Sequence, residues 1–248
     1  LDARISRLEK RSMATVPTQN VEAYTLYLKG RTEYFKYTYG GFEKSIDYYR
    51  QALKLDPSYA LAYSGMGDSY GQMYIDNQDE LYSELSIQSS EKALSINKDL
   101  AEGYKARALI SRQLGHIFEA INMDKRAVEL GYGMAESNLA LSFWWQGDLS
   151  KSIKHHLRSR QNDPNNLRGI HNLALAYQAL EDYDELHNLI SDAMEKHPDG
   201  FELHQILITQ YCIEGNWKKA RATMERLLLL WPNDNHAHRV AADLFLFA

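Results

Sequence analysis

Histidines are the residues of this sequence that first suggest metal chemistry, because there are nine of them. An imidazole nitrogen is a common ligand of transition metals, but several ligands must converge on one point. Residues that converge on a helix are three or four positions apart. His155 and His156 are adjacent, and His236 and His238 are two positions apart, so neither pair converges. We therefore expect no metal site.

Acidic residues near position 80 are a second candidate for ion chemistry, since Asp76, Asp79 and Glu80 stand close together. A calcium loop of the EF-hand type requires glycine at its sixth position and a bidentate glutamate at its twelfth. Counted from Asp76, those positions hold Leu81 and Ile87. The sequence also lacks the common glycine-rich phosphate-binding motifs. We expect a solvated acidic loop and no cofactor.

Cys212, the only cysteine, is the remaining candidate for catalysis. A thiol nucleophile needs a base beside it and a donor that stabilises the developing oxyanion. His171 is a candidate base, but no residue pattern supplies the donor or a third group that orients the histidine. We expect no enzymatic activity. A single cysteine also excludes an intrachain disulfide.

The composition is that of a globular chain with a sizeable core, with 44% hydrophobic and 25% charged residues among 248. The net charge of −5 argues against nucleic acid as a partner, since phosphate binding needs an excess of cations. The longest apolar runs have a few residues, whereas a bilayer span needs about 20. We expect a cytoplasmic protein, although a periplasmic one with few cysteines would look the same. Because the sequence begins with Leu1 and no signal-peptide pattern follows, we expect a fragment of a longer protein.

Prolines at a fixed interval indicate the elements that must position any functional residue. Pro164, Pro198 and Pro232 are 34 residues apart, and Pro57 closes a similar phrase earlier in the chain. Proline ends a helix because it cannot donate the helical hydrogen bond. A 34-residue period with proline at its end is typical of a helix–turn–helix repeat.

Other residue types recur in the same register. Glycine ends a helix at low cost, and it stands at the expected turns as Gly115, Gly147 and Gly215. Asp148 and Asn216 follow two of these glycines as predicted N-caps of the next helix. Small residues in each second helix allow close packing, and an aromatic residue late in each first helix fills the remaining space. The small residues are Ser45, Ala120, Ser152 and Ala220 near the start of the second helix and Ala52, Ala93, Ala127, Ser159 and Ala193 near its end; the aromatic residues are Tyr34, Tyr70, Phe143, Tyr177, Tyr211 and Phe245.

Together these positions resemble the tetratricopeptide repeat (TPR), and the resemblance extends over residues 20–248. It implies an all-α fold, a right-handed superhelix (α-solenoid) of about six helix–turn–helix repeats followed by an unpaired C-terminal helix. The second repeat lacks the closing proline and carries about seven extra residues near 74–82, and Glu181 replaces the turn glycine of the fifth. The expected repeats are about 24–59, 60–100, 101–132, 133–166, 167–200 and 201–234, with a partial seventh over 235–248.

The N-terminal residues carry a second resemblance. Leu1, Ile5 and Leu8 lie at helical spacing, with basic residues on the other faces. The phrase over 16–30 is similar to the junction between a TolB-like domain and TPRs in bacterial signalling proteins. Such proteins often end in a class III nucleotide cyclase, a Ser/Thr kinase or a winged-helix regulator. Residues 1–19 are therefore expected to form a short amphipathic helix and linker, and 20–248 the TPR domain.

First helices line a concave face in the TPR fold, and that face is the usual binding surface of repeat proteins. The register places Asn138 and Asn172 on it, 34 positions apart. In TPR proteins that bind extended peptides, asparagine at this position often contacts the ligand backbone, since a carboxamide both donates and accepts hydrogen bonds. Bonding to a neighbouring helix is the alternative for both side chains. The other predicted peptide-binding residues are Lys105, Arg112, Leu141, Trp144, Trp145, Arg168, His171 and Gln178.

Two subsets of these residues indicate the kind of ligand. Of Trp144 and Trp145, one is expected to pack inside and the other to be an exposed aromatic anchor, with burial of both as the alternative. The cations among the predicted residues give this face a basic bias that favours an acidic peptide or a C-terminal carboxylate. Chaperone-binding TPRs use a lysine and an arginine four positions apart, but here Leu109 follows Lys105 at that spacing.

The C-terminal helix is expected to expose an apolar face, made of Val240, Ala241, Leu244, Phe245 and Phe247. More chain or a partner must cover that face, and pairing of two such ends would give a homodimer. The sequence thus predicts a non-catalytic module that binds an extended peptide or protein segment, without nucleic acid and without membrane insertion. The alternative is a regulatory or sensory arm of a bacterial multidomain signalling protein that acts through oligomerisation.

Overall fold

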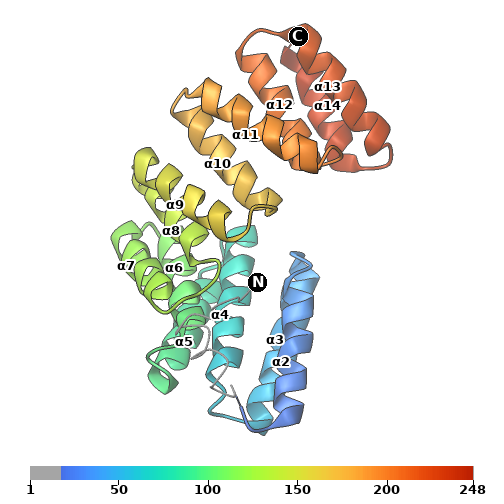
Figure 1. The fold of residues 1–248 in the computed structure, drawn as a ribbon. Helices are drawn as coiled ribbons and strands as arrows, with labels where there is room; N and C mark the ends of the chain where they lie inside the picture. The colour runs from blue at the N-terminus through green and yellow to red at the C-terminus, as the bar shows by residue number, and fades with distance from the viewer. Residues whose placement is uncertain (1–17, 248) are drawn as a thin grey trace, which may run out of the picture. The chain divides into compact units, whose positions relative to one another are not determined.

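The computed structural model describes the backbone of residues 18–247 and the side chains of that range apart from 236 and 243–247. This part of the chain is all-helical and forms consecutive helix–turn–helix hairpins in two compact units that meet at Gln146 and Gly147 (Figure 1). The first unit contains α2 (Val21–Tyr34), α3 (Tyr39–Leu55), α4 (Ala60–Asn77), α5 (Glu80–Ile96), α6 (Ala101–Gln113), α7 (Ile117–Glu129) and α8 (Ala135–Gln146). The second contains α9 (Leu149–Asn162), α10 (Leu167–Ala179), α11 (Tyr183–Lys196), α12 (Phe201–Ile213), α13 (Trp217–Leu230) and α14 (Asn235–Phe247).

Helix starts are fixed by side-chain caps where the sequence predicts them. The carboxylate of Asp148 accepts a hydrogen bond from the backbone N–H of Lys151 at 3.0 Å. The carboxamide oxygen of Asn216 accepts one from the N–H of Lys219 at 3.3 Å. Each cap satisfies a backbone donor that has no partner inside the helix. Both predicted N-caps are therefore confirmed.

The turns inside the hairpins require a left-handed residue. Gly115, Gly147 and Gly215 have φ angles of 80°, 85° and 69°, so the predicted role of the three glycines is confirmed. In the fifth repeat Glu181 adopts the same conformation, with a φ of 59°. A residue with a Cβ atom meets a steric penalty of about 1 kcal/mol there. The turn geometry is therefore kept even where glycine is lost.

Helix ends follow the prolines. The helices α3, α9, α11 and α13 each end two residues before Pro57, Pro164, Pro198 and Pro232, respectively. The residue between helix and proline leaves the helical conformation in each case, because the proline ring disfavours that conformation in its predecessor. The proline positions thus give the repeat ends correctly.

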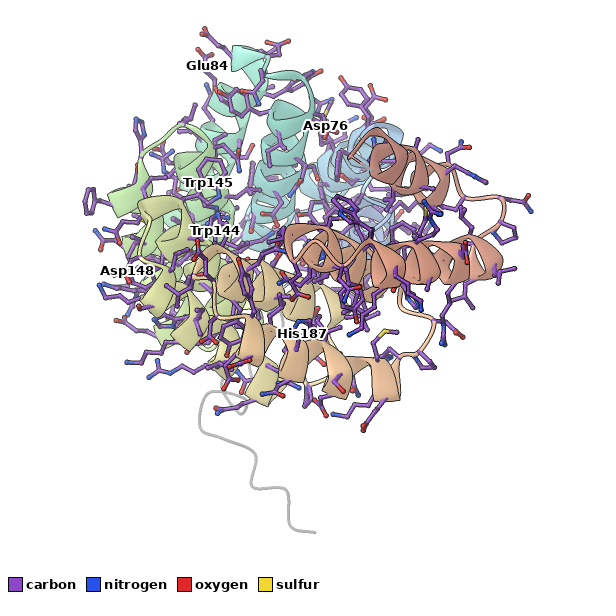
Figure 2. All side chains as sticks on the ribbon, turned by 90° about the horizontal axis from the view of Figure 1, so that it is seen from above. Asp76, Glu84, Trp144, Trp145, Asp148 and His187 are labelled. Atoms are coloured by element: carbon purple, nitrogen blue, oxygen red, sulfur yellow. The ribbon has the colours of Figure 1, made fainter. Side chains whose placement is uncertain are left out.

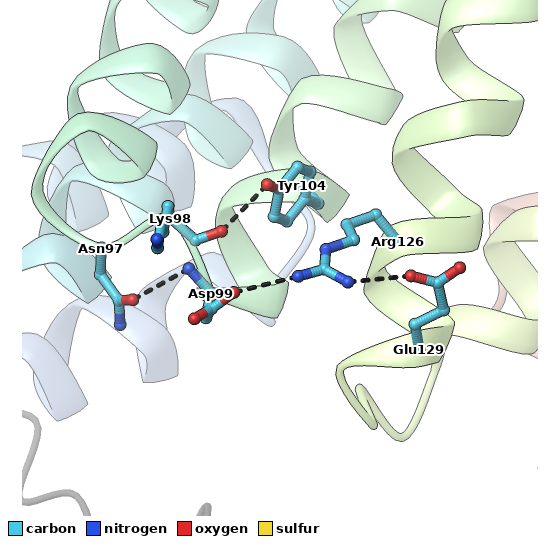
Figure 3. Close-up of polar contacts among 6 residues, drawn as sticks. All are labelled: Asn97, Lys98, Asp99, Tyr104, Arg126 and Glu129. Atoms are coloured by element: carbon cyan, nitrogen blue, oxygen red, sulfur yellow. Dashed lines mark hydrogen bonds and ion pairs between the residues drawn. The ribbon is translucent and has the colours of Figure 1, made fainter.

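The second repeat ends without proline, and side chains hold its turn instead (Figure 3). The carboxamide oxygen of Asn97 accepts the backbone N–H of Asp99 at 3.0 Å. Arg126 on α7 then donates to the carboxylate of Asp99 at 3.0 Å and to that of Glu129 at 2.9 Å. The hydroxyl of Tyr104 donates to the carbonyl of Lys98 at 2.9 Å. An asparagine turn closed by α6 and α7 therefore replaces the missing proline.

The extra residues of the second repeat lie in helices. The helix α4 has 18 residues and α5 has 17, whereas α6 and α7 have 13 each. Asp76 is in the last turn of α4, Asp79 is the N-cap of α5 and Glu80 is its first residue. All three are exposed, as expected, and Asp76 is labelled in Figure 2. The predicted acidic loop is wrong because only two residues separate the helices.

The predicted small residues of the second helices are all buried, which confirms their packing role. Of the recurring aromatic residues Tyr34, Tyr70, Phe143 and Tyr177 are buried and Tyr211 is half-buried. The side chain of Phe245 lies outside the described residues.

One ring in the first unit shows how closely the helices approach. Tyr49 on α3 is fully buried between Gly30 of α2 and Gly65 of α4. A Cβ atom at Gly65 would lie 2.6 Å from ring atom Cζ of Tyr49, and one at Gly30 would lie 2.8 Å from Cδ1. Because both distances are below van der Waals contact, each helix can touch the ring only where it has glycine. The same ring lies 5.8 Å from the ring of Tyr27.

Neighbouring first helices contact one another within each unit. In the first unit α2 packs on α4, α4 on α6 and α6 on α8, and in the second unit α10 packs on α12. Each of α2, α4 and α6 also packs on the helix that follows it. The first helices therefore form a layer of their own in the first unit, and a side chain of α4 can reach both α2 and α6.

Three expectations about the two ends of the chain fall wholly or partly outside the described residues. The predicted N-terminal amphipathic helix lies outside the described residues, as do the side chains of Leu244, Phe245 and Phe247. Val240 and Ala241 pack against the core of the second unit. The proposed pairing through this end stays a prediction. Among the described residues, none of the helices combines the length and the hydropathy needed to cross a membrane.

Candidate functional site

Three charged residues meet on the first-helix layer of the first unit. Asp68 on α4 lies between Arg31 on α2 and Lys105 on α6. The ammonium of Lys105 is 2.7 Å from Oδ2 of Asp68. The guanidinium of Arg31 is 3.8 Å from the same oxygen, which is too long for a hydrogen bond. We call these three residues the Asp68 cluster.

Aromatic rings surround the cations of the Asp68 cluster. The guanidinium carbon of Arg31 lies 4.5 Å from the ring centre of Phe35 and 5.4 Å from that of Tyr34. The ammonium nitrogen of Lys105 is also 5.4 Å from the centre of Tyr34. Cations at these distances are attracted by the negative ring faces. The rings hold both cations near the protein surface and shield them from much of the solvent.

Burial in the Asp68 cluster is graded. The side chain of Asp68 is 2% exposed, that of Lys105 14% and that of Arg31 22%. Burial alone lowers the pKa of Lys105 and of Arg31, but the charge of Asp68 and the neighbouring tyrosines more than offset it, so both pKa values are raised. Both cations therefore keep their charge at any physiological pH.

The Asp68 cluster is incomplete in two respects. Two cations face one carboxylate, so one positive charge has no counterpart in the cluster. In addition, Oδ1 of Asp68 is buried without a hydrogen-bond partner, and none of residues 18–247 accepts a hydrogen bond from the guanidinium of Arg31. Unpaired polar groups in a buried position are costly, and such groups are rare in folded proteins.

A second charged cluster in the same unit is complete in charge, although Oδ1 of its aspartate, Asp124, is also buried without a hydrogen-bond partner. The guanidinium of Arg112 on α6 lies 3.2 Å from Oδ2 of Asp124 on α7 and 2.7 Å from the hydroxyl of Ser142 on α8. That hydroxyl donates to Oδ2 of Asp124 at 2.6 Å. Burial raises the pKa of Asp124 to about 6 and lowers the pKa of Arg112. We call these three residues the Asp124 cluster.

The Asp124 cluster corrects one expectation. Arg112 is predicted to lie on the binding face, but its side chain is buried and its charge is paired inside the unit. Repeat register gives the helix face of a residue, and it does not reveal an acidic partner on the adjacent second helix. We therefore assign Arg112 a structural role.

The other predicted residues of the first unit lie on α6 and α8. Lys105 belongs to the Asp68 cluster. Asn138, Leu141 and Trp144 are half-buried, while Trp145 is 52% exposed (Figure 2). No hydrogen bond to the carboxamide of Asn138 is formed by the residues whose side chains the structure describes. This face of α8 therefore presents an unused polar group near an exposed aromatic ring.

The predicted residues of the second unit lie on α10. Arg168 is exposed, and His171 and Asn172 are half-buried. Burial lowers the pKa of His171, so its ring is neutral at neutral pH. The carboxamide of Gln178 is engaged, because it donates to Gln210 at 3.0 Å. Gln178 is thus less available to a ligand than the sequence suggests.

Gln178 begins a polar chain that continues to α11. Gln210, which is fully buried, donates to the carboxylate of Glu214 at 2.9 Å. Glu214 also lies 2.7 Å from the ring nitrogen Nε2 of His187. This chain links α10, α12 and α11 and fixes the orientation of Gln178.

The histidines, the acidic residues and Cys212 are the candidates for metal binding and catalysis. No group of three or more histidine, cysteine or acidic side chains is placed to hold a metal ion in the described part of the chain. Burial raises the pKa of the Cys212 thiol, whereas a nucleophilic cysteine needs a lowered one.

Arg31 is the functional candidate that sequence reasoning missed. Asp68 is among the inner-face positions of the repeat register, but nothing in the sequence pairs it with Arg31, 37 positions earlier. A usable signal is the isolated acidic residue in a segment rich in glycine and serine over 64–71, because a carboxylate that is buried there must find cations on neighbouring helices.

Comparisons with known proteins agree with the helix pattern. The family model of the TPR repeat matches residues 37–73. PilW, a widely conserved type IV pilus biogenesis factor, is similar in structure with a TM-score of 0.70 at 16% identity, over 90% of this chain and 99% of that one. PilF of Pseudomonas aeruginosa has a TM-score of 0.63 at 15% identity, with 90% and 97% covered. YrrB, described as a TPR protein with an unusual peptide-binding site, has a TM-score of 0.51 at 14% identity, with 78% and 97% covered.

Proposed function

We propose that the chain is a TPR-repeat protein and that it is an interaction module that binds an extended segment of a partner protein on its first helices. The observation that carries the proposal is the carboxamide of Asn138, which is half-buried on α8 and unused by the described part of the fold. Asn172 occupies the same repeat position on α10, and its carboxamide is likewise half-buried and unused. The fold shared with YrrB, a protein described as having a peptide-binding site, supports the class of function.

A carboxamide in this position suits an extended backbone. It donates through its NH2 and accepts through its oxygen, so one asparagine can pair with both polar groups of a peptide unit. Half-burial favours binding because fewer water molecules compete for the groups. Each such hydrogen bond contributes about 0.5–1.5 kcal/mol. Each asparagine can therefore supply a moderate, sequence-independent part of the affinity in its own unit.

Trp145 is the second element of the proposed surface. Its ring is 52% exposed on the same helix as Asn138, while the neighbouring Trp144 is half-buried. Exposed tryptophans are frequent anchors of protein interfaces because they bury a large area at a low entropic cost. We assign Trp145 the apolar contact and Asn138 the backbone contact of a bound segment.

The test compares two double variants with peptides selected by the wild-type protein from a displayed library of random dodecamers. Asn138→Ala with Asn172→Ala should raise the Kd of selected peptides about 5- to 150-fold, which corresponds to the loss of one hydrogen bond at each asparagine. Asn122→Ala with Asn188→Ala is the matched control, since both asparagines are exposed on the second helices α7 and α11. The control should bind like the wild type, and all Tm values should agree within about 2 °C.

Two results would contradict the proposal. One is the selection of no peptide by the wild-type protein. The other is a large fall in Tm of the Asn138/Asn172 variant with unchanged binding, because the asparagines would then support the fold and not the ligand.

A further inference from the structure

A pocket opens between the second helices α3 and α5, near the start of both. Its volume is about 480 Å³, and α3, α4 and α5 of the first unit line it. We propose that this pocket, which we call the α3–α5 pocket, receives an apolar side chain from a basic segment of a partner protein. Asn138 and Asn172 are not part of its lining, so the site goes beyond the function proposed above.

The extra residues of the second repeat build one wall of the α3–α5 pocket. Tyr82 lies in the first turn of α5 and belongs to the segment 74–82, which exceeds the repeat period. Its ring stacks on that of Tyr70, with the ring centres 6.2 Å apart. Its hydroxyl forms a hydrogen bond of 2.9 Å with the hydroxyl of Tyr39, which joins the start of α5 to the start of α3. The wall is therefore held by contacts inside the unit, and it is a feature of this chain that the repeat pattern does not contain.

The lower part of the α3–α5 pocket is apolar. Ile46, Tyr70 and Met73 line it, and each is at most 4% exposed. The guanidinium of Arg50 donates to the hydroxyl of Tyr70 at 2.8 Å, so this polar atom needs no partner from a ligand. An entering group thus meets aliphatic, thioether and ring surfaces. An apolar side chain gains free energy there because its surface leaves water, whereas a polar one would lose hydrogen bonds.

The surface around the α3–α5 pocket carries an excess of negative charge. The lining itself is balanced, with two exposed carboxylates and two exposed cations on α3: Glu43, Asp47, Lys44 and Arg50. The excess comes from the segment 76–84 at the turn between α4 and α5, which has four carboxylates and no lysine or arginine. Figure 2 labels Asp76 and Glu84 of this segment.

Two carboxylates from different helices act on the same phenol beside the pocket. The pKa of Tyr39 is raised, mainly by its hydrogen bond with Tyr82 and in part by the charges of Glu43 and Asp79. Charges this close are not fully screened, since screening extends over about 10 Å at physiological salt. A surface of this sign attracts cations and repels anions. The segment that carries the apolar side chain is therefore basic.

The experiment uses the full chain and three pools of nonapeptides with blocked termini. In the first pool the central residue is leucine, the positions two before and two after it are lysine, and all others are uncharged. The second pool has glutamate in place of both lysines, and the third has serine in place of leucine. The immobilised protein is equilibrated with each pool, and captured peptides are counted by mass spectrometry.

The wild-type protein should distinguish the three pools. The first should be captured about 3- to 30-fold better than the glutamate pool, as expected for two exposed ion pairs. It should be captured about 5- to 50-fold better than the serine pool, as expected for burial of a leucine side chain. This comparison needs no variant, so a misfolded variant would not remove the test.

A variant that narrows the pocket assigns the binding to it. Gly40 lines the pocket, and a Cβ atom there would meet nothing within 4 Å, so Gly40→Phe adds a ring without a clash. It should reduce capture of the first pool to the level of the serine pool. Gly133→Phe is the matched control, because Gly133 is also exposed in the first unit and has the same open space around it. The control should capture like the wild type.

Charge variants test the acidic surface separately. Glu43→Gln with Asp47→Asn should reduce the advantage of the first pool over the glutamate pool about 3- to 10-fold and leave its advantage over the serine pool. Glu195→Gln with Asp199→Asn is the matched control, since both residues are exposed in the second unit, have the same spacing and change the net charge equally. The control should keep both preferences.

Failures of this inference and of the proposed function give different results. Equal capture of the first pool and the glutamate pool by the wild-type protein would overturn the basic partner. Unchanged capture by Gly40→Phe would overturn the assignment to the α3–α5 pocket. Asn138→Ala with Asn172→Ala should capture the first pool like the wild type. A loss in that variant would place the peptides on the first helices, which would support the proposed function and overturn the pocket.

Discussion

The Asp68 and Asp124 clusters use the same ingredients in one unit and differ in completeness. Each places a buried aspartate within reach of an arginine of a first helix. In the Asp124 cluster one cation meets one carboxylate, and Ser142 bonds to both. In the Asp68 cluster two cations share one carboxylate. The Oδ1 oxygen of the aspartate is buried without a hydrogen-bond partner in both clusters, so the difference lies in the charge balance.

The difference separates a structural contact from a candidate binding site. A complete cluster gains nothing from a ligand, because any new anion would leave an excess negative charge in a buried place. An incomplete cluster on the same layer of helices gains a counterion from a ligand. Charge balance and exposure together therefore indicate whether a cluster can bind an anion. The mere presence of a cation does not, because both clusters contain one.

The largest effect is expected from breaking the complete cluster. Asp124→Ala leaves the charge of Arg112 buried without a partner, so the free energy of unfolding should fall by about 3–5 kcal/mol. The double variant Arg112→Met with Asp124→Leu removes both charges and should lose less than the single variant. Urea denaturation of both proteins measures the difference. A double variant as unstable as Asp124→Ala would mean that packing, and not the unpaired charge, explains the loss.

A smaller effect is expected from titration of Asp124. Its pKa is about 6 in the folded protein and 3.8 in the reference state. As the pH rises, the unfolded chain therefore loses this proton at a lower pH than the folded protein does. The stabilisation by the protonated carboxyl is complete below pH 4 and is lost as the pH rises through 6, with a total change of about 3 kcal/mol. Urea denaturation of the wild type and of Asp124→Asn between pH 4 and pH 7 isolates this contribution. A constant difference between the two proteins would contradict the raised pKa.

The smallest effect is expected from removing the extra cation of the incomplete cluster. Arg31→Gln leaves Asp68 and Lys105 as a one-to-one pair and breaks no hydrogen bond of the described fold, so stability should change by less than about 1 kcal/mol. Arg112→Gln is the matched change in the complete cluster and should cost about 2–4 kcal/mol. Thermal and urea unfolding of both variants test this ranking. Equal losses would remove the distinction between the two clusters.

The sequence predicted the elements well because its signals are local. Proline, glycine and capping residues act on their own turn, so Pro164, Gly147 and Asp148 mark the repeat at the positions where the structure has them. The acidic segment after Asp76 was misjudged because its neighbours also form good helices. Residues in excess of the 34-residue repeat can lengthen a helix as readily as they lengthen a loop.

The candidate site was predicted less well because it depends on residues far apart in the chain. Lys105 was found from its place in the repeat, but its pairing with Asp68 and the part played by Arg31 require the packing of three helices. Arg112 was misplaced for the same reason, since Asp124 belongs to another helix. Repeat register predicts which face a residue occupies and leaves open which charges it meets there.

The ring of Tyr49 between Gly30 and Gly65 has a consequence for how this sequence can change over time. Either glycine can gain a side chain only after the ring has become smaller, and a smaller ring leaves a cavity until a glycine has been replaced. Each single substitution is therefore disfavoured, whereas a smaller side chain at 49 together with a larger one at a glycine position keeps the packed volume constant. In related sequences we expect these three positions to covary, so that tyrosine at 49 accompanies glycine at both 30 and 65.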